Sequence, residues 1–306
     1  MMTAPGNRPS LAPRNWPGWV GVGFIWVLGK LPQRVGLWLS VPLAWALWAL
    51  MRHRRRIAGC NIKRCFPAMG EAERRALLKA CFRSLARTLF EIAWSWSAAD
   101  VRILTLGHVE GLEHCLAAQR GGRGVLLVTA HMSCLEMGGR LLGQSMPAAG
   151  IYRPLRSPVL EWFQTRARLR YGTAMISKRD TRSAVRLLRD GGAVWYAPDQ
   201  DFGREQSVFA PFFGIQTATL SATRRLAQMT GCAVVPMFPV YDVATRLYTL
   251  RILPALESFP SDDPVVDLGR INRIMETHIR AAPEQYWWIH RRFKTRPEGE
   301  PPFYAD

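Results

Sequence analysis

Two residues near the middle of the chain, His131 and Glu136, have the side chains that general acid–base chemistry needs. A carboxylate that accepts the Nδ1 proton of a histidine fixes its tautomer, leaves Nε2 free as a base and stabilises the imidazolium. His131 and Glu136 are five residues apart. In one continuous helix each residue turns by about 100°, so two residues with this spacing would not share a face. The pairing therefore requires the histidine in a turn and the glutamate in the first turn of the following helix.

The sequence around this pair predicts such a setting. Glycines at 121, 122 and 124 precede a β-branched run at 125–129, which is typical of a buried parallel strand. Ser133 lies three residues before Glu136 and an apolar run follows, so a capping box predicts a helix that begins at Ser133. His131 would then lie at the carboxyl end of a strand, where open α/β sheets bind ligands. The plainer alternative is that Glu136 only caps its helix and His131 is a core residue.

Polar residues follow other predicted strands in the same way. Asp199 and Asp201 end the buried run 193–198, and two acids at this spacing are a weak signal for a metal site. Arg153 lies in a turn bounded by prolines, and Lys178 and Arg179 close another short strand. Side chains at these positions can reach a ligand above the sheet edge, although ordinary surface charge is the alternative.

Two neighbours of His131, Ser133 and Cys134, are possible nucleophiles. Neither lies in a Gly-x-Ser-x-Gly turn, and Ser133 already has a capping role, so we expect no covalent intermediate. The six cysteines form no CxxC pair and no His/Cys cluster, which indicates reduced thiols and no zinc site.

The charge balance predicts an anionic partner, because 41 Lys and Arg face 23 Asp and Glu, a formal net charge of +18. Arg182, Arg186 and Arg189 form one stripe at helical spacing, either a solvated face or a docking surface. Residues 284–296 interleave aromatic and cationic side chains, which fits a phosphate-rich interface or single-stranded nucleic acid.

The amino-terminal region predicts a membrane anchor. Residues 1–15 have the composition of a disordered lead, and two apolar blocks follow at 16–29 and 35–51. A full span needs about 20 apolar residues. The first block could therefore span with Lys30 at the surface, while the second lies in the interface or packs on the domain. The basic run 52–56 would stay in the cytoplasm.

The remaining periodicities predict the elements between these motifs. They indicate strands at 101–109 and 233–240, an edge strand at 248–253, and helices at 57–96 with a break at Pro67, at 217–229 and at 268–281. An apolar, aromatic loop is expected at 209–214, suited to hydrocarbon.

Five blocks in order resemble the late (secondary) lipid A acyltransferases, the lauroyl/myristoyl type within the glycerolipid acyltransferase superfamily. The blocks are His131 to Glu136 and residues 152–154, 196–201, 209–214 and 284–297. The resemblance implies a three-layer α/β/α fold with a central mixed, mostly parallel sheet. It also implies a membrane-anchoring segment at 16–56 and an acyltransferase domain at 57–306 on the cytoplasmic face of the inner membrane.

The resemblance also implies the chemistry. His131 and Glu136 would carry out acyl transfer from an acyl carrier protein thioester to a hydroxyl of a 3-hydroxyacyl chain on a lipid A precursor. Arg153, Arg179 and the 199–201 block, with Asp199 and Asp201, would lie near the substrate. No metal and no cofactor are implied.

Other functions fit part of the pattern. The same base could activate water in a thioesterase or lipid hydrolase, or serve another membrane lysophospholipid or glycolipid O-acyltransferase. A membrane-tethered nucleic-acid binder would explain the charge. However, the cations lie at strand ends beside a His–Glu pair and no nucleic-acid motif appears, so we expect no nucleic-acid partner.

Overall fold

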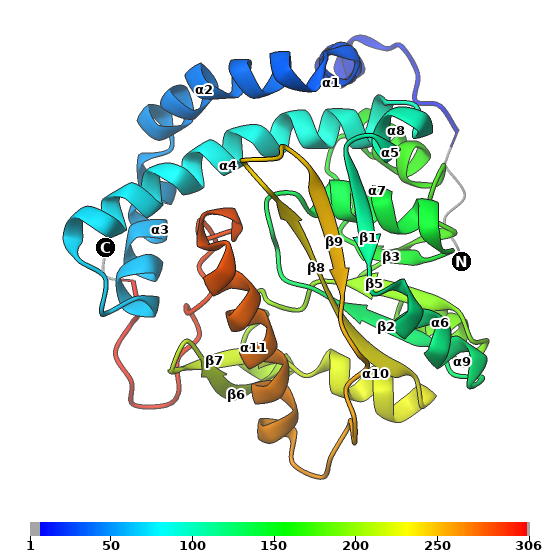
Figure 1. The fold of residues 1–306 in the computed structure, drawn as a ribbon, viewed down its shortest axis with the longest axis vertical. Coiled ribbons are helices and arrows are strands. Elements are labelled where there is room, and N and C mark those ends of the chain that lie inside the picture. Colours follow the sequence, from blue (N-terminus) through cyan, green and yellow to red (C-terminus); the bar gives the residue numbers. More distant parts are fainter. Residues whose placement is uncertain (1–6, 305–306) are drawn as a thin grey trace.

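A seven-stranded sheet runs through the molecule in the order β1-β9-β8-β2-β5-β3-β4 (Figure 1). The computed structural model describes residues 7–304. Neighbouring strands are parallel except β8 and β9, so the sheet is mixed and mostly parallel as predicted. Its strands are β1 (Gly107–Glu110), β2 (Val125–Val128), β3 (Ala149–Tyr152), β4 (Ala174–Ser177), β5 (Ala193–Tyr196), β8 (Ala233–Tyr241) and β9 (Tyr248–Ile252). A separate antiparallel hairpin consists of β6 (Ser207–Phe212) and β7 (Ile215–Leu220).

Helices cover both faces of this sheet, which gives the expected three layers. On one face lie α7 (Leu135–Ser145) and α8 (Pro158–Arg168), with the long α4 (Glu71–Ser97) packed over α7 (Figure 1). On the other face lie α9 (Thr181–Arg189) and α10 (Ala222–Thr230), while α11 (Pro264–Ala281) packs against β6 and β8. Two short helices, α5 (Asp100–Leu104) and α6 (Leu112–Arg120), flank β1.

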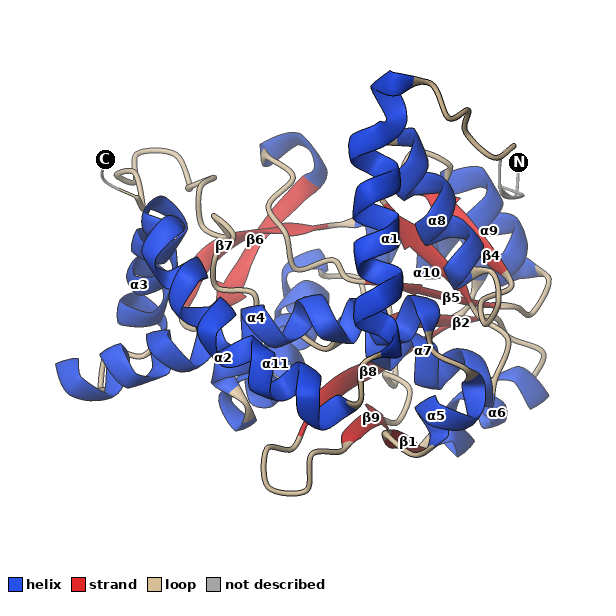
Figure 2. Cartoon of the chain, turned by 90° about the horizontal axis from the view of Figure 1, so that it is seen from above, coloured by secondary structure: helices blue, strands red, loops and turns tan. Residues whose placement is uncertain are grey.

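The amino-terminal helices lie along α4. α1 (Trp16–Lys30) and α2 (Gln33–Leu50) both pack on it, and α1 also contacts α8, where the Trp19 and Trp162 ring centroids are 5.6 Å apart (Figure 2). The side chains that face away from α4 are apolar and exposed. They include Trp38, which is 75% exposed, and Trp45, which is 68% exposed.

Among residues 7–304, no single helix is long and apolar enough to cross a membrane. α2 and α3 (Arg52–Cys65) pass that test only as a pair, and the pair is bent by 92°. Of the predicted disordered lead, residues 1–6 lie outside the described part. Pro13–Asn15 form a short 3₁₀ helix, and the Trp16 indole donates to the Leu11 carbonyl at 3.0 Å. These residues correct the prediction of a disordered segment through residue 15.

Three element predictions are wrong. The predicted strand 101–109 is mostly α5, and only its end forms β1. The predicted helix 217–229 begins as β7, because its alternating Thr and apolar residues pair with β6, which was expected to be a loop. β9 is not an edge strand, because β1 pairs with its other side.

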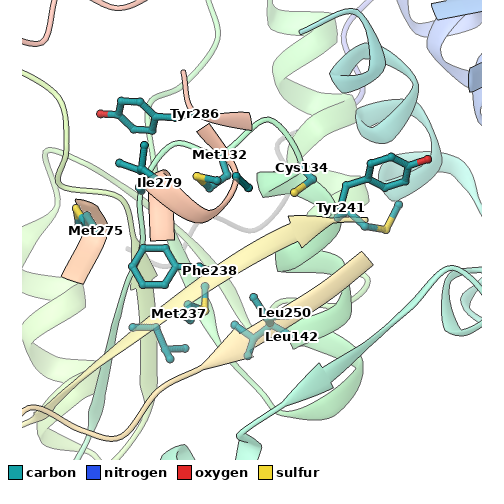
Figure 3. Close-up of a cluster of buried hydrophobic side chains, with 14 of the residues drawn as sticks. Met132, Cys134, Leu142, Met237, Phe238, Tyr241, Leu250, Met275, Ile279 and Tyr286 are labelled. Carbon is teal, nitrogen blue, oxygen red and sulfur yellow. The ribbon is translucent and has the colours of Figure 1, made fainter. Parts of the chain in front are cut away.

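An apolar cluster anchors the turn that follows β2. Figure 3 shows Met132 and Cys134 of this turn in the same buried cluster as Phe238, Leu250 and Tyr286. All five side chains are at most 6% exposed. Because two residues of the turn are held in the core, the position of His131 between strand and helix is well defined.

Candidate active site

The turn that carries His131 lies between β2 and α7, at the carboxyl end of the central strand, as the sequence predicts. The helix begins at Leu135 with Cys134 as its cap residue, two residues later than expected. Ser133 makes no capping hydrogen bond. Its backbone N–H donates to the Gln285 carbonyl at 2.6 Å, and its hydroxyl lies 3.5 Å from the Arg87 guanidinium. The capping-box prediction is therefore wrong, although the strand–turn–helix setting is confirmed.

Asp199 holds the imidazole of His131. Its Oδ1 lies 2.5 Å from His131 Nδ1, and its Oδ2 accepts the His131 backbone N–H at 2.9 Å. The carboxylate is buried, whereas the imidazole is 28% exposed. Two hydrogen bonds to one residue fix both the turn and the ring, and they leave Nε2 as the ring nitrogen that Asp199 does not bind.

The electrostatics of this pair suit a base. Burial would lower the pKa of His131, but the Asp199 carboxylate outweighs burial and raises that pKa above its ordinary value of 6.5. Burial would likewise raise the pKa of Asp199, but the charge of His131 and its hydrogen bonds hold it below the ordinary range. The carboxylate thus stays ionised while the imidazole takes up and releases a proton.

Glu136 does not orient His131, which corrects the prediction from sequence. Its Oε2 accepts the Trp96 indole N–H at 2.8 Å and the Arg168 Nε at 3.2 Å, and a second Arg168 nitrogen donates to Oε1. Because α7 begins only at Leu135, the first helical turn directs Glu136 toward α4 and α8, away from the imidazole. Glu136 and Arg168 form a charge pair in the wall of the same cavity.

A carboxyl-terminal segment clasps the catalytic turn. Met132 and Tyr286 form an antiparallel bridge, and the Trp287 N–H donates to the His131 carbonyl at 2.9 Å. The Gln285 side chain in turn accepts the Tyr241 N–H at 2.9 Å, which ties the segment to β8. The pattern of residues 284–296 fitted a phosphate-rich interface or single-stranded nucleic acid, but Tyr286, Trp288, Arg292 and Phe293 are buried in this clasp and its surroundings.

Helix α4 packs against the turn that carries His131 and hydrogen-bonds to it. The Thr88 hydroxyl donates to the Ser133 carbonyl at 3.1 Å, and Arg87 pairs with the buried Glu91 at 2.7 Å. The Tyr248 hydroxyl donates to the same Glu91 oxygen at 3.1 Å. These contacts place a rigid polar layer under the turn.

A cavity of about 1020 Å³ opens beside His131. It extends along the carboxyl ends of β3, β4 and β5 and reaches helices on both faces of the sheet. Part of its α7–α8 side is apolar, with Gly139, Leu142, Gly150, Met175 and Trp195 among the lining residues, and Glu136, Gln164 and Arg168 also line this side.

Gln200 also lines the cavity near the histidine. Its amide nitrogen lies 3.2 Å from His131 Nε2, so it occupies the place where a substrate hydroxyl would bind. Gln200 belongs to the 196–201 block but was not singled out as a contact of the histidine. Its position in a loop after β5 sets this contact, and no spacing rule predicts it.

The other predicted site residues separate into two groups. Arg153, Lys178 and Arg179 are exposed and line the cavity, so both basic residues of the 178–179 pair reach it. Asp201 does not line the cavity. It is buried, and its carboxylate accepts hydrogen bonds from the Thr295 N–H at 2.8 Å and the Thr295 hydroxyl at 2.9 Å. Asp201 thus holds a loop, and Asp199 holds His131, which corrects the expectation that these two acids contact substrate.

The described residues contain no group of three or more His, Cys, Asp or Glu side chains that could hold a metal ion. Of the two possible nucleophiles, Cys134 is buried with its Sγ 3.7 Å from the Gln285 amide oxygen, and burial raises the pKa of its thiol. Ser133 is buried beside a guanidinium and has no base next to it. Neither side chain lines the cavity.

Arg168 and Trp96, the partners of Glu136, were not predicted. Arg168 lies on a helix recognisable from sequence as basic and amphipathic, but only the packing of α8 on α7 and α4 brings it to Glu136. Gln285 and Trp287 lay in a block that the sequence marked as distinctive, and its role as a clasp comes from tertiary pairing.

Comparison with known proteins identifies the family. The family model described as bacterial lipid A biosynthesis acyltransferase matches residues 4–295. The lipid A biosynthesis lauroyltransferase of Escherichia coli K12 is 40% identical over 295 residues, 96% of each chain. The palmitoleoyltransferase of the same organism is 40% identical over 299 residues, 97% of each chain. A solved structure, the 1-acyl-sn-glycerophosphate acyltransferase of Thermotoga maritima, aligns with a TM-score of 0.38 at 16% identity, covering 88% of this chain and 98% of that one. The chain therefore belongs to the bacterial lipid A biosynthesis acyltransferases.

Proposed function

We propose that this enzyme transfers a fatty acyl chain from an acyl carrier protein thioester to the hydroxyl of a 3-hydroxyacyl chain on a lipid A precursor. One observation carries the proposal: a histidine with a raised pKa, held by a buried carboxylate, borders a large cavity with an apolar side. This arrangement suits a base that acts on the hydroxyl of a lipid. Membership of the family supports the acyl acceptor.

The transfer needs one proton acceptor and no covalent enzyme intermediate. His131 Nε2 removes the proton of the acceptor hydroxyl as its oxygen attacks the thioester carbonyl carbon. The tetrahedral intermediate collapses with cleavage of the C–S bond, and the imidazolium returns the proton to the departing thiolate. Asp199 stabilises the imidazolium between these steps. The Gln200 amide gives up its place at Nε2 when the hydroxyl binds.

The negative charge on the carbonyl oxygen needs a donor. From the sequence, backbone N–H groups at the start of the helix or Arg153 could supply it, but the Ser133 and Leu135 N–H groups already donate to the carbonyls of Gln285 and Met132. Arg168 lines the cavity with its guanidinium fixed by Glu136, so we assign it this electrostatic role. Arg153, at the exposed rim, suits the acidic head group of the acceptor.

The apolar side of the cavity suits an acyl chain. A Cβ on Gly150 would be in ordinary van der Waals contact with Met175, 3.7 Å away, so Met175 and Trp195 pack against this glycine. By contrast, a Cβ on Gly139 would lie 2.5 Å from the Trp195 ring, so α7 and β5 are in direct contact there. We assign the hydrocarbon chain to the cavity wall that Leu142, Met175 and Trp195 form.

We also propose that α1 and α2 attach the enzyme to the inner membrane with the catalytic domain on the cytoplasmic face. Both helices pack one side on α4 and expose apolar side chains on the other. Exposed tryptophans at 16, 26, 38 and 45 suit the membrane–water interface. The arrangement favours helices that lie in the interface.

The test uses the purified enzyme with acyl carrier protein thioester and a lipid A precursor. We expect a product heavier by one acyl group, formed by the wild type and not by His131→Ala. Omitting the acceptor measures hydrolysis as release of free fatty acid. Fatty acid release without an acylated product, when the acceptor is present, would instead make the enzyme a thioesterase.

A further inference from the structure

The cavity has a second side, away from the apolar wall. On the face of the sheet covered by α9 and α10 it is lined by Thr181, Ala184, Leu226 and Met229. It therefore reaches these two helices as well as α7 and α8. Neither α9 nor α10 contains an acidic residue.

Five exposed cations lie on or beside this side of the cavity: Lys178, Arg179 and Arg225 line it together with Asp180, and Arg182 and Arg186 follow on α9. Within residues 7–304, none of the four arginines forms an ion pair. Two other arginines on the same helices, Arg189 and Arg224, already have hydrogen-bond or ion-pair partners.

The Arg189 guanidinium donates to the Met229 carbonyl at 3.0 Å, and Arg224 pairs with Asp267 at 3.0 Å. The basic stripe seen in the sequence is thus reduced to Arg182 and Arg186, and the other three cations come from neighbouring segments. We call the five residues the cavity-rim cations.

This surface lies away from the apolar face of α1 and α2. In Figure 1 those two helices run along one side of the molecule, and α9 and α10 lie on the opposite side. Large exposed aromatic side chains occur on α1 and α2, whereas Met229 is the only large exposed hydrophobic residue within α9 and α10. A lipid surface would meet aromatic residues at its interface. The cavity-rim cations therefore fit a soluble partner.

We infer that the cavity-rim cations dock the acidic carrier protein that delivers the acyl thioester. This inference rests on the proposed function, and it assigns the donor and the lipid acceptor to opposite sides of the sheet. A small acidic protein is steered to such a surface by charge, and docking there places its thioester arm beside the part of the cavity that α9 and α10 line. The acyl chain then passes over the strand ends to the apolar side, close to His131.

The test reverses the charge of Arg182 and Arg186 in the full-length enzyme. Its matched control reverses Lys79 and Arg83 on α4, two exposed cations with the same helical spacing and the same change in charge. We measure binding of the carrier protein without an acyl chain, KM for its acyl thioester at low and high salt, and KM for acyl-pantetheine, which lacks the protein.

In R182E/R186E we expect carrier affinity to fall and KM for the carrier thioester to rise about tenfold or more at low salt, with a weaker salt dependence. Turnover at saturation and KM for acyl-pantetheine should stay within about twofold, because these side chains do not touch the reacting atoms. The control should behave as wild type.

Two results would overturn the inference: carrier binding unchanged in R182E/R186E, or an equal loss in K79E/R83E. A rise in KM for the lipid acceptor alone would place acceptor phosphates or the membrane at this surface instead. If the wild type neither binds the carrier nor uses its thioester, the proposed donor itself is wrong, and that outcome is separate from a misplaced docking surface.

Discussion

Two pairs of a carboxylate with a basic side chain flank the same turn, and they differ in whether the basic side chain can change its protonation. His131–Asp199 lies at the strand end, and Glu136–Arg168 lies at the start of the helix. A histidine changes its protonation near neutral pH, whereas a guanidinium stays charged at any working pH. In the proposed mechanism the first pair therefore moves a proton and the second supplies a fixed charge. The pair that is closest in sequence, His131 and Glu136, is thus divided between two different functions.

The variant that tests this difference between the two pairs most strongly is His131→Ala. Removal of the base should lower kcat by about 10³ to 10⁴, because general base catalysis contributes on this order. Circular dichroism should show a folded protein, since the turn is also held by its backbone bonds to Gln285 and Trp287. Turnover close to wild type in the folded variant would remove His131 from the mechanism.

Asp199→Asn should have the next largest effect, a loss of about 10² to 10³ in kcat, because the imidazolium loses its counter-charge. Its signature is in the pH profile. Activity needs neutral His131, so it falls as the pH drops through the raised pKa of that residue. Without the Asp199 charge that pKa falls, and the acid limb of kcat/KM should move to lower pH. If the acid limb of kcat/KM stays at the same pH in this variant, a group other than His131 sets its position.

Glu136→Gln should cost less, about 10- to 10²-fold, since it keeps an oxygen for the Trp96 indole but leaves Arg168 without its carboxylate. The acid limb should stay in place, because burial and Asp199 govern the pKa of His131. If Glu136→Gln moves the limb as far as Asp199→Asn does, the separation of the two pairs is wrong. Steady-state kinetics of both variants across one pH series gives the comparison directly.

Cys134→Ala should have the smallest effect, within about twofold in kcat, because the thiol is buried against Gln285 and does not line the cavity. A modest loss in thermal stability is expected from the space left in the core. Loss of most activity without loss of folding would restore a thiol nucleophile.

The strand, the turn and the position of His131 could be predicted because glycine breaks and a β-branched run are local signals. The partner of His131 could not, since Asp199 is 68 residues away and only the parallel pairing of β2 with β5 brings them together. The same holds for Glu136: its spacing from His131 suggested contact, but the start of α7 at Leu135 and the packing of α8 decided otherwise. The sequence therefore pointed to His131, Glu136 and Asp199, but it paired His131 with the wrong carboxylate. It did not point to Arg168.

The clasp formed by residues 285–287 has a consequence for how the enzyme is made. Gln285 lies 151 residues after Cys134, so the ribosome completes β2, α7 and most of the sheet before it synthesises the segment that holds the catalytic turn. Helices α1 and α2 are synthesised before this sheet, and the clasp is synthesised after it. The helices proposed to bind the membrane can therefore meet a lipid surface while the turn that carries His131 still lacks its clasp.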